Sequence, residues 1–434
     1  MPTDSATTLP RPTPAWRWAA LVLASVAMFG NYYAYDALNP VIDLLRDAQG
    51  LTEIQVKATS SAYQIAALLM LLVGGWLIDR FGARVTILAF AAVCVVAAAV
   101  TAAADSYTGV WAGRFLLGLG AEPLIVAVTA VLAKWFKGKE LSFAFGLNLS
   151  ISRLGSAATD WSPTFAPSLY TNWQDPMWLA TGVMSVGLAA AFLYWMLEKG
   201  AQRRFVLGDP PAADRLEPRA MYRFGAAYWY IVALCVVFYS TVFPFRSFAI
   251  DYFQQAHGLT REAAGILSSL LPVAAIVATP LFGLWVDRVG RRGLFMLAGS
   301  AAMLPLFLAV TYLPPGPAIA VPFTTVALPL TLFVAMLVFG VVFSLIPAVM
   351  WPAVAYIVEE RRLGSAYSLM TFCQQIGWLI VPLAIGWLDQ RSGAGPDNVG
   401  GYAPGMWLYT ALSALGLFFA WKLLQSEKKP ASSF

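Results

Sequence analysis

Two opposite charges stand inside long apolar stretches and are the residues best suited to bind a polar molecule. Glu122 lies in GRFLLGLGAEPLIVA, and Arg153 lies in FGLNLSISRLGS. A charge at the centre of a bilayer costs about 2.5–3.5 kcal/mol even on the lenient insertion scale, so it faces a cavity or a partner. A carboxylate suits an ammonium group, and a guanidinium binds a carboxylate through two parallel hydrogen bonds. The pair either binds the two ends of a zwitterion or forms a structural ion pair, and the residue types favour neither.

The spacing of these charges places them at one depth. Glu122 precedes Gly138, the centre of an expected tight turn, by sixteen residues, and Arg153 follows Gly138 by fifteen. At a rise of about 1.5 Å per residue, each lies about 22–24 Å from the turn. Because consecutive helices are antiparallel, both charges reach the middle of the membrane, where carriers bind their substrates.

The stretch GNYYAYD adds polar aromatic residues to this region. Asn31 and Tyr35 share one helix face, and Tyr32 and Asp36 share the adjacent one. At membrane depth they either line a cavity or form an interfacial aromatic belt. Asp36 is a spare acid here and a candidate proton site.

Arg114 lies near the end of its segment, where a hydrogen bond between helices is a better role than substrate contact. On the remaining walls of the cavity we expect Asn148, beside Arg153 in sequence, and four residues of the second half of the chain: Tyr239, Trp351, Gln375 and Trp378.

Composition identifies the solvent around these residues as lipid. Of 434 residues, 59% are hydrophobic and 12% are charged, against roughly 25% charged in soluble proteins. The single histidine and three cysteines have no metal-site or disulfide spacing. We therefore expect no enzyme, no metal and no cofactor.

Apolar runs of about 20 residues recur along the chain and predict membrane-spanning helices, because barrel strands are much shorter. Twelve segments are expected, at 16–46, 52–80, 84–104, 107–137, 139–170, 175–199, 223–253, 262–288, 291–313, 325–357, 363–390 and 403–425. They divide the chain into a tail (1–15), a six-helix half (16–199), a linker (200–222), a second six-helix half (223–425) and a final tail (426–434).

Charge in the loops predicts the orientation. With the N-terminus inside, twenty-one lysines and arginines fall on the cytoplasmic side and four on the outer side. This positive-inside distribution predicts cytoplasmic termini. The net charge of +5 thus reflects topology, and no nucleic-acid partner is expected.

The two halves repeat a loop motif. GWLIDRFGAR at 75–84 matches GLWVDRVGRR at 283–292, and such a repeat of six helices is typical of transporters. The charged members of the motif anchor helix ends in headgroups or form clasps that open as a carrier moves. Because the motif occurs twice at matching places, we favour gating for Asp79, Arg80, Arg84, Asp287 and Arg288, with Arg114 as a further conformational residue.

At these residues the sequence resembles a known family. GNYYAYD, GGWLIDRFG, GRFLLGLGAEPLIVA, WFKGKELSFAFGLNLSISRLGS, FGLWVDRVG and WPAVAYIVEERRLGSAYSLM together resemble the lysosomal dipeptide transporter branch of the major facilitator superfamily. The resemblance covers nearly all of the chain from 29 to 390. It implies a facilitative dipeptide carrier in which Glu122 meets the amino end of the peptide and Arg153 the carboxylate end.

The sequence lacks an N-terminal dileucine-type sorting signal and loop glycosylation sites. A bacterial cytoplasmic membrane is therefore expected, with a lysosomal membrane as the alternative. We expect a monomer in the bilayer, and no accessory subunit is evident. Two other functions remain open: proton-driven transport of another small organic ion or drug, and a non-transporting receptor or scaffold. The last is the weakest, because a scaffold needs neither gate motifs nor midplane charges.

Overall fold

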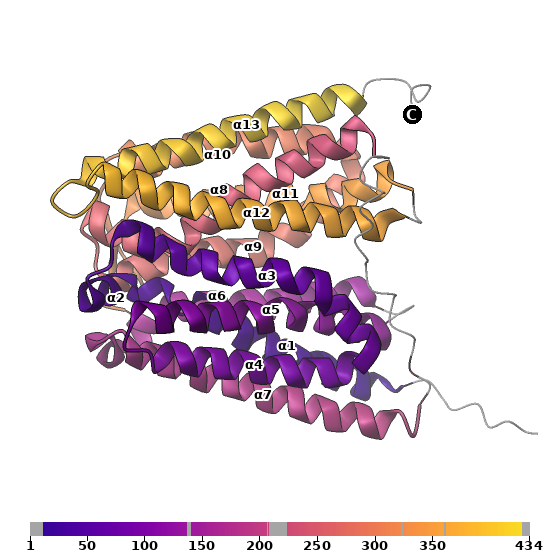
Figure 1. Cartoon of the computed structure of the whole chain (residues 1–434). Helices are drawn as coiled ribbons and strands as arrows, with labels where there is room; N and C mark the ends of the chain where they lie inside the picture. The colour runs from indigo at the N-terminus through magenta and orange to yellow at the C-terminus, as the bar shows by residue number, and fades with distance from the viewer. Residues whose placement is uncertain are drawn as a thin grey trace, which may run out of the picture.

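In the part of the chain that the structure describes, twelve long helices are aligned along one direction (Figure 1). The computed structural model describes residues 12–136, 140–205, 207, 224–322, 324–359 and 362–427. The first six long helices are α1 (Pro14–Asp36), α3 (Glu53–Phe81), α4 (Ala83–Ala102), α5 (Tyr107–Phe136), α6 (Leu141–Phe165) and α7 (Gln174–Ala201). The second six are α8 (Ala226–His257), α9 (Arg261–Val289), α10 (Arg292–Tyr312), α11 (Leu330–Ile357), α12 (Leu363–Arg391) and α13 (Ala403–Glu427).

The twelve predicted segments each correspond to one of these helices, which confirms the helical fold. In the described part of the chain, nine helices are long and apolar enough to cross a membrane on length and composition alone. The other three are α1, α3 and α6. These helices bury polar side chains such as Asn31, Gln64 and Asp160, which lower their mean hydropathy.

The first predicted segment, 16–46, is wrong as a single helix. After α1 ends at Asp36, a 3-10 turn (Asn39–Val41) leads into a short helix, α2 (Ile42–Gln49). Pro40 explains the break, because proline lacks an N–H and disfavours helical geometry in the residue before it.

Two other segment ends also differ. The fifth segment, expected to reach 170, ends as α6 at Phe165 and continues as a 3-10 helix (Pro167–Thr171). The tenth, expected from 325, begins at Leu330 because an antiparallel hairpin of β1 (Ala318–Ala320) and β2 (Ala327–Pro329) precedes it. A further 3-10 helix (Val399–Tyr402) leads into α13. The predicted linker begins inside α7, and residues 208–222 of it lie outside the described residues, as do most of both tails.

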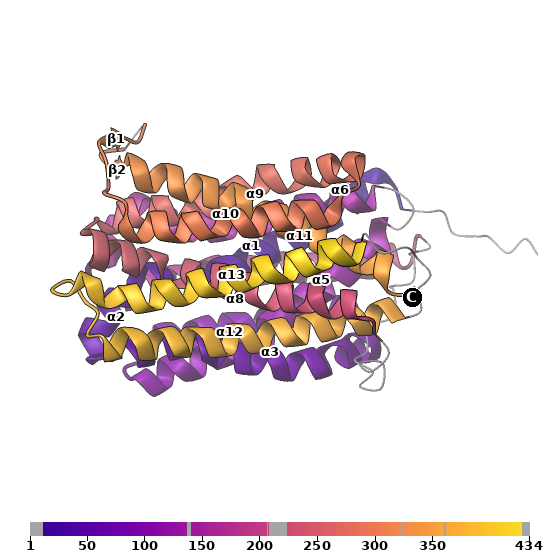
Figure 2. The same cartoon turned by 90° about the horizontal axis from the view of Figure 1, so that it is seen from above.

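The helix contacts follow one pattern in both halves. In the first half α1 packs on α6 and α7, α3 on α5, and α4 on α5 and α7. In the second half α8 packs on α12 and α13, α9 on α11, and α10 on α11 and α13. Each of these contacts in the first half has a counterpart in the second half, between the two helices that lie six places further along the series of twelve. The halves meet where α3 lies beside α12 and α6 beside α9 (Figures 1 and 2), so the two interfaces are also related by this shift.

The two ends of the bundle differ. The start of α1 and the end of α13 lie together at one end, called here the terminal end, and α2 lies at the opposite end, called the α2 end (Figure 1). The repeated loop motif lies at the terminal end, where Gly82 and Gly290 have φ of 77° and 73°. These left-handed values favour glycine, and they occur at matching positions of the two halves.

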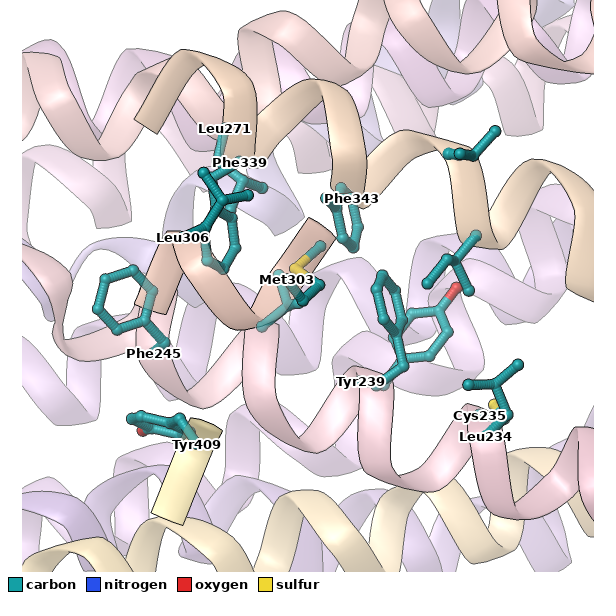
Figure 3. Close-up of a cluster of buried hydrophobic side chains, with 14 of the residues drawn as sticks. Leu234, Cys235, Tyr239, Phe245, Leu271, Met303, Leu306, Phe339, Phe343 and Tyr409 are labelled. Atoms are coloured by element: carbon teal, nitrogen blue, oxygen red, sulfur yellow. The ribbon is translucent and has the colours of Figure 1, made fainter. Parts of the chain in front are cut away.

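Each half has its own apolar core. The core of the second half includes Leu234, Tyr239, Phe245, Phe339 and Phe343, whose side chains come together between neighbouring helices (Figure 3). The first half has an alanine-rich core around α1, α4, α5 and α7. Because these two cores are separate, the halves contact each other mainly through the α3–α12 and α6–α9 surfaces.

Close backbone approach makes one of those surfaces. A Cβ added at Gly265 of α9 would clash with the carbonyl oxygen of Asp160 on α6. In contrast, a Cβ at Gly283 of the same helix would meet nothing within 4 Å. The α6–α9 interface therefore requires glycine at position 265, whereas position 283 of α9 has room for a side chain.

We predict that Gly265→Ala lowers the midpoint of thermal unfolding, because overpacking a tight contact costs about 1–3 kcal/mol. Gly283→Ala is the matched control, since both changes carry the same intrinsic helix-propensity gain of about 1 kcal/mol. Purified protein is measured in detergent. Equal midpoints for the two variants would contradict the close α6–α9 contact.

Candidate functional site

A cavity of about 500 Å³ lies between the two halves. Its walls come from α1, α3, α5 and α6 of the first half and from α8, α9, α11 and α12 of the second. The predicted residues that line it are Asn31, Tyr32, Tyr35, Asp36, Glu122, Arg153, Tyr239, Trp351, Gln375 and Trp378. Asn148 is not among the lining residues, because its side-chain oxygen accepts a hydrogen bond from Ser25 of α1 at 3.0 Å.

Glu122 projects from the middle of α5, one residue before Pro123. Its Oε1 atom accepts a hydrogen bond from the Tyr63 hydroxyl of α3 at 2.9 Å, and Gln375 of α12 lines the same cavity. The tyrosine is neutral, so it orients the carboxylate without cancelling its charge.

Arg153 projects from α6 towards the second half. Its Nη1 atom donates to the carbonyl oxygen of Ala275 at 2.8 Å and to the hydroxyl of Thr279 at 2.9 Å, both on α9. These acceptors are also neutral. Arg153 therefore bridges the two halves and keeps its positive charge at the wall of the cavity.

Glu122 and Arg153 thus share one cavity, and within the described residues no ion pair joins them. Their charges are held by neutral groups on different helices. The arrangement can bind a molecule that carries a cation at one end and an anion at the other, because each charge is available to a ligand.

The second half supplies an aromatic wall, defined here as Tyr239, Phe243, Phe343, Trp351 and Trp378. Its rings lie 4.6–6.5 Å apart, centroid to centroid, between neighbours. Glu122 and Arg153, which come from the first half, therefore share the cavity with these rings of the second half, which also contributes polar residues such as Arg246 and Gln375.

Asp36 is engaged, so the expectation of a spare acid is wrong. It pairs with Arg246 of α8 at 2.5 Å, and its other oxygen accepts from Ser156 at 2.5 Å. Arg246 also pairs with Asp160 of α6 at 3.1 Å. The three charged residues are 6% exposed or less, and this cluster, called here the buried triad, joins α1 and α6 to α8.

Further ion pairs join the halves beyond the triad. Arg46 of α2 binds Asp251 of α8 at 2.5 Å, and Arg261 of α9 binds Asp43 of α2 at 2.5 Å. Within the first half, Arg46 also binds Glu53 of α3 at 3.0 Å. Burial acts to lower the pKa of the Arg46 guanidinium, but Asp251 and Glu53 outweigh it and raise that pKa above its usual value. In the part of the chain that the structure describes, every ion pair between the halves lies on the α2 side of the cavity.

The residues expected to act in gating lie outside the cavity. Arg114 donates to the Tyr35 carbonyl at 2.8 Å, and its guanidinium lies over the Tyr35 and Tyr63 rings. It therefore holds α5 against α1 and α3.

At the terminal end, Arg80 lies over the Trp76 ring, Arg84 donates to Gln202 at 3.1 Å, and Arg288 is exposed. The side chains of Asp79 and Asp287 lie outside the described residues, so the expected clasps stay predictions.

The sequence did not predict the roles of two groups of residues at the site. Tyr63 and Thr279 hold the two charges, but hydroxyl-bearing residues are common in apolar helices and carry little signal alone. Arg246 and Asp160 were recognisable as intramembrane charges. Their pairing was not, because 86 and 210 residues separate Arg246 from its two partners along the chain.

Comparison with known proteins places these features in a family. The model of the Major Facilitator Superfamily matches residues 24–248 and again residues 232–434. The lysosomal dipeptide transporter MFSD1 of Homo sapiens is 29% identical over 87% of this chain and 81% of its own length. The probable sulfoacetate transporter SauU of Cupriavidus necator is 22% identical, over 81% of this chain and 82% of its own.

A solved structure supports the fold. The crystal structure of a bacterial homologue of the human lysosomal transporter Spinster, in an inward-facing and occupied conformation, aligns with a TM-score of 0.73. The alignment covers 97% of this chain and all of the other, at 15% identity. It confirms the twelve-helix architecture in two halves.

We predict that Arg246→Leu destabilises the protein, because Asp36 and Asp160 would then lie buried without their counter-charge. Breaking a buried pair in this way costs about 3–5 kcal/mol. The triple variant Arg246→Leu, Asp36→Asn, Asp160→Asn removes all three charges, and it is expected to recover much of the loss. Thermal unfolding of the two variants tests this, and a triple variant no more stable than Arg246→Leu would show that the charges are not coupled.

Proposed function

Because the chain belongs to the major facilitator superfamily, we propose that it transports dipeptides by alternating access, recognising both ends of the peptide in the cavity between its halves. The chain is a multi-pass membrane transporter and not an enzyme. The dipeptide substrate and the residues that bind it are the proposal.

The observation that carries this proposal is the separation of Glu122 and Arg153. Opposite charges in one cavity of low dielectric would gain energy by pairing, yet each is hydrogen-bonded instead to neutral groups. A zwitterion placed between them supplies both missing partners at once. The peptide ammonium group would bind Glu122, and its carboxylate would bind the guanidinium of Arg153.

Length also favours a dipeptide. Two extended residues span at most roughly 7 Å. We propose that the gap between Glu122 and Arg153 matches this length, so that a free amino acid is too short to reach both charges and a longer peptide overruns them. The human relative is named as a dipeptide transporter, which agrees with this substrate. The Cupriavidus necator relative is instead named as a probable transporter of sulfoacetate, a small organic anion.

Orientation and conformation complete the proposal. Loop charges favour cytoplasmic termini in a bacterial cytoplasmic membrane. The α2 end is then the outer end, where ion pairs join the halves, and the structure corresponds to a state closed to the outside. In this scheme Arg80, Arg84, Arg288 and their motif partners control the cytoplasmic end. The protein would act as a monomer.

The mode of transport is proposed to be facilitated diffusion. A dipeptide with neutral side chains is electrically balanced, and Asp36 is already paired with Arg246. Proton coupling is the second candidate, and the buried triad favours it in one respect. It holds two carboxylates against one guanidinium, so a proton would balance its charge.

We predict that Glu122→Gln and Arg153→Ala each weaken dipeptide binding at least about tenfold, since a charge-assisted contact contributes about 1.5–3 kcal/mol. Binding is measured by calorimetry with Ala-Ala. Acetylating the amino end should weaken binding to the unmodified protein but add little to the loss in Glu122→Gln. Amidating the carboxyl end should behave likewise in Arg153→Ala. End-blocked peptides that bind as tightly as free ones would contradict the proposed contacts.

We also predict that an imposed pH gradient does not drive a neutral dipeptide above its equilibrium distribution in proteoliposomes. Uptake down a dipeptide gradient serves as the positive control. Uphill accumulation that depends on the pH gradient and is lost in Asp36→Asn or Asp160→Asn would establish proton coupling through the triad instead.

A further inference from the structure

Most polar atoms of the aromatic wall are engaged within the protein. The indole N–H of Trp351 donates to the Tyr239 hydroxyl at 2.9 Å, and the indole N–H of Trp378 donates to the Tyr239 carbonyl at 2.8 Å. Both indole donors are thus consumed within the protein. A ligand that touches this wall meets mainly ring carbon, and the Tyr239 hydroxyl keeps a proton to donate.

The wall is also held in place from behind. Phe243 lies at its centre, 4.6 Å from the Trp378 ring, 5.5 Å from Tyr239 and 5.7 Å from Phe343. Tyr239 and Phe343 belong to the buried core of the second half (Figure 3). A preformed surface binds a side chain without the cost of ordering several rotamers.

The ends and the side chains of a peptide would use different walls. Glu122 and Arg153, which take the ends in the proposed function, come from α5 and α6. An extended dipeptide directs its two side chains to opposite sides, and the aromatic wall of α8, α11 and α12 lines the same cavity as the two charges. One side chain can therefore reach this wall while both ends stay bound.

We infer that the aromatic wall is the side-chain subsite of the cavity and selects dipeptides with a large apolar side chain, aromatic ones most strongly. This inference rests on the proposed function. Ring contacts of this kind add to the energy of apolar burial. Acidic side chains are disfavoured, because ring faces are electron-rich, and of the two described cations at the cavity Arg246 is already paired and Arg153 takes the peptide carboxylate.

The test measures dissociation constants for Phe-Ala, Ala-Phe, Ala-Ala and Ala-Glu on the full-length purified protein. The better of the two phenylalanine peptides is expected to bind at least about tenfold more tightly than Ala-Ala, as burial of an aromatic side chain requires. Ala-Glu should bind most weakly.

Phe243→Ala should reduce the ratio between the phenylalanine peptide and Ala-Ala to about threefold or less. Phe192→Ala is the matched control, because Phe192 is exposed on α7 away from the cavity, and it should keep the full ratio. Phe243→Leu retains apolar bulk and is expected to give an intermediate ratio. If Phe243→Ala does not fold, Phe243→Leu serves as the test. An affinity ratio in Phe243→Leu that equals the ratio in the unmodified protein would overturn the role of the ring.

The outcomes separate this inference from the function on which it rests. Free-ended dipeptides that all bind equally would overturn the subsite and leave the dipeptide function intact. If no free-ended dipeptide binds, the proposed function fails, and the subsite with it. Tight binding of N-acetyl-phenylalanine amide would mean that the wall takes apolar compounds regardless of their ends, which overturns both.

Discussion

The cost of placing a charge in a low-dielectric interior governs the whole centre of this protein. The chain meets that cost in two different ways. Asp36 and Asp160 are both paired with Arg246 in a buried cluster, which joins the two halves. Glu122 and Arg153 are held by neutral hydrogen-bonding groups, which leave their charges available. The first arrangement holds the two halves together, and in the proposed function the second would bind the two ends of a ligand.

These two arrangements are physically linked. Asp36 and Arg246 line the same cavity as Glu122 and Arg153, and α1 carries both Tyr32 of the cavity and Asp36 of the triad. A ligand that draws α1, α6 and α8 together would therefore act on the contacts that close the α2 end. Buried ion pairs suit such a role because their formation nearly balances their desolvation, so they can break and reform without a large net change in free energy.

Much of the fold was predictable from sequence, because lipid leaves a chain few options. Long apolar runs must become helices, and the repeated motif around Gly82 and Gly290 indicated two equivalent halves. The break at Pro40 shows where such reasoning fails. Apolar residues such as Leu38 and Ile42 lie on both sides of it, so the apolar run did not reveal where α1 ends and α2 begins. In the site, intramembrane Glu122 and Arg153 were identified correctly as cavity residues, because polar groups in lipid need an interior destination. The partners of Asp36 could not be predicted, since they depend on which helices of the two halves face each other.

The symmetry of the scaffold contrasts with the asymmetry of the cavity. Helix contacts repeat from the first half to the second, yet the two halves contribute different side chains to the cavity. Glu122 and Arg153 come from the first half, whereas the second contributes the aromatic wall and Arg246, which is paired with Asp36 and Asp160. In the proposed function, the symmetric backbone would let the halves move against each other about shared contacts. The two charges would fix the direction of a small polar molecule, and the rings would select its side chain. Movement would then depend on the arrangement of the helices, and recognition on the side chains that they carry.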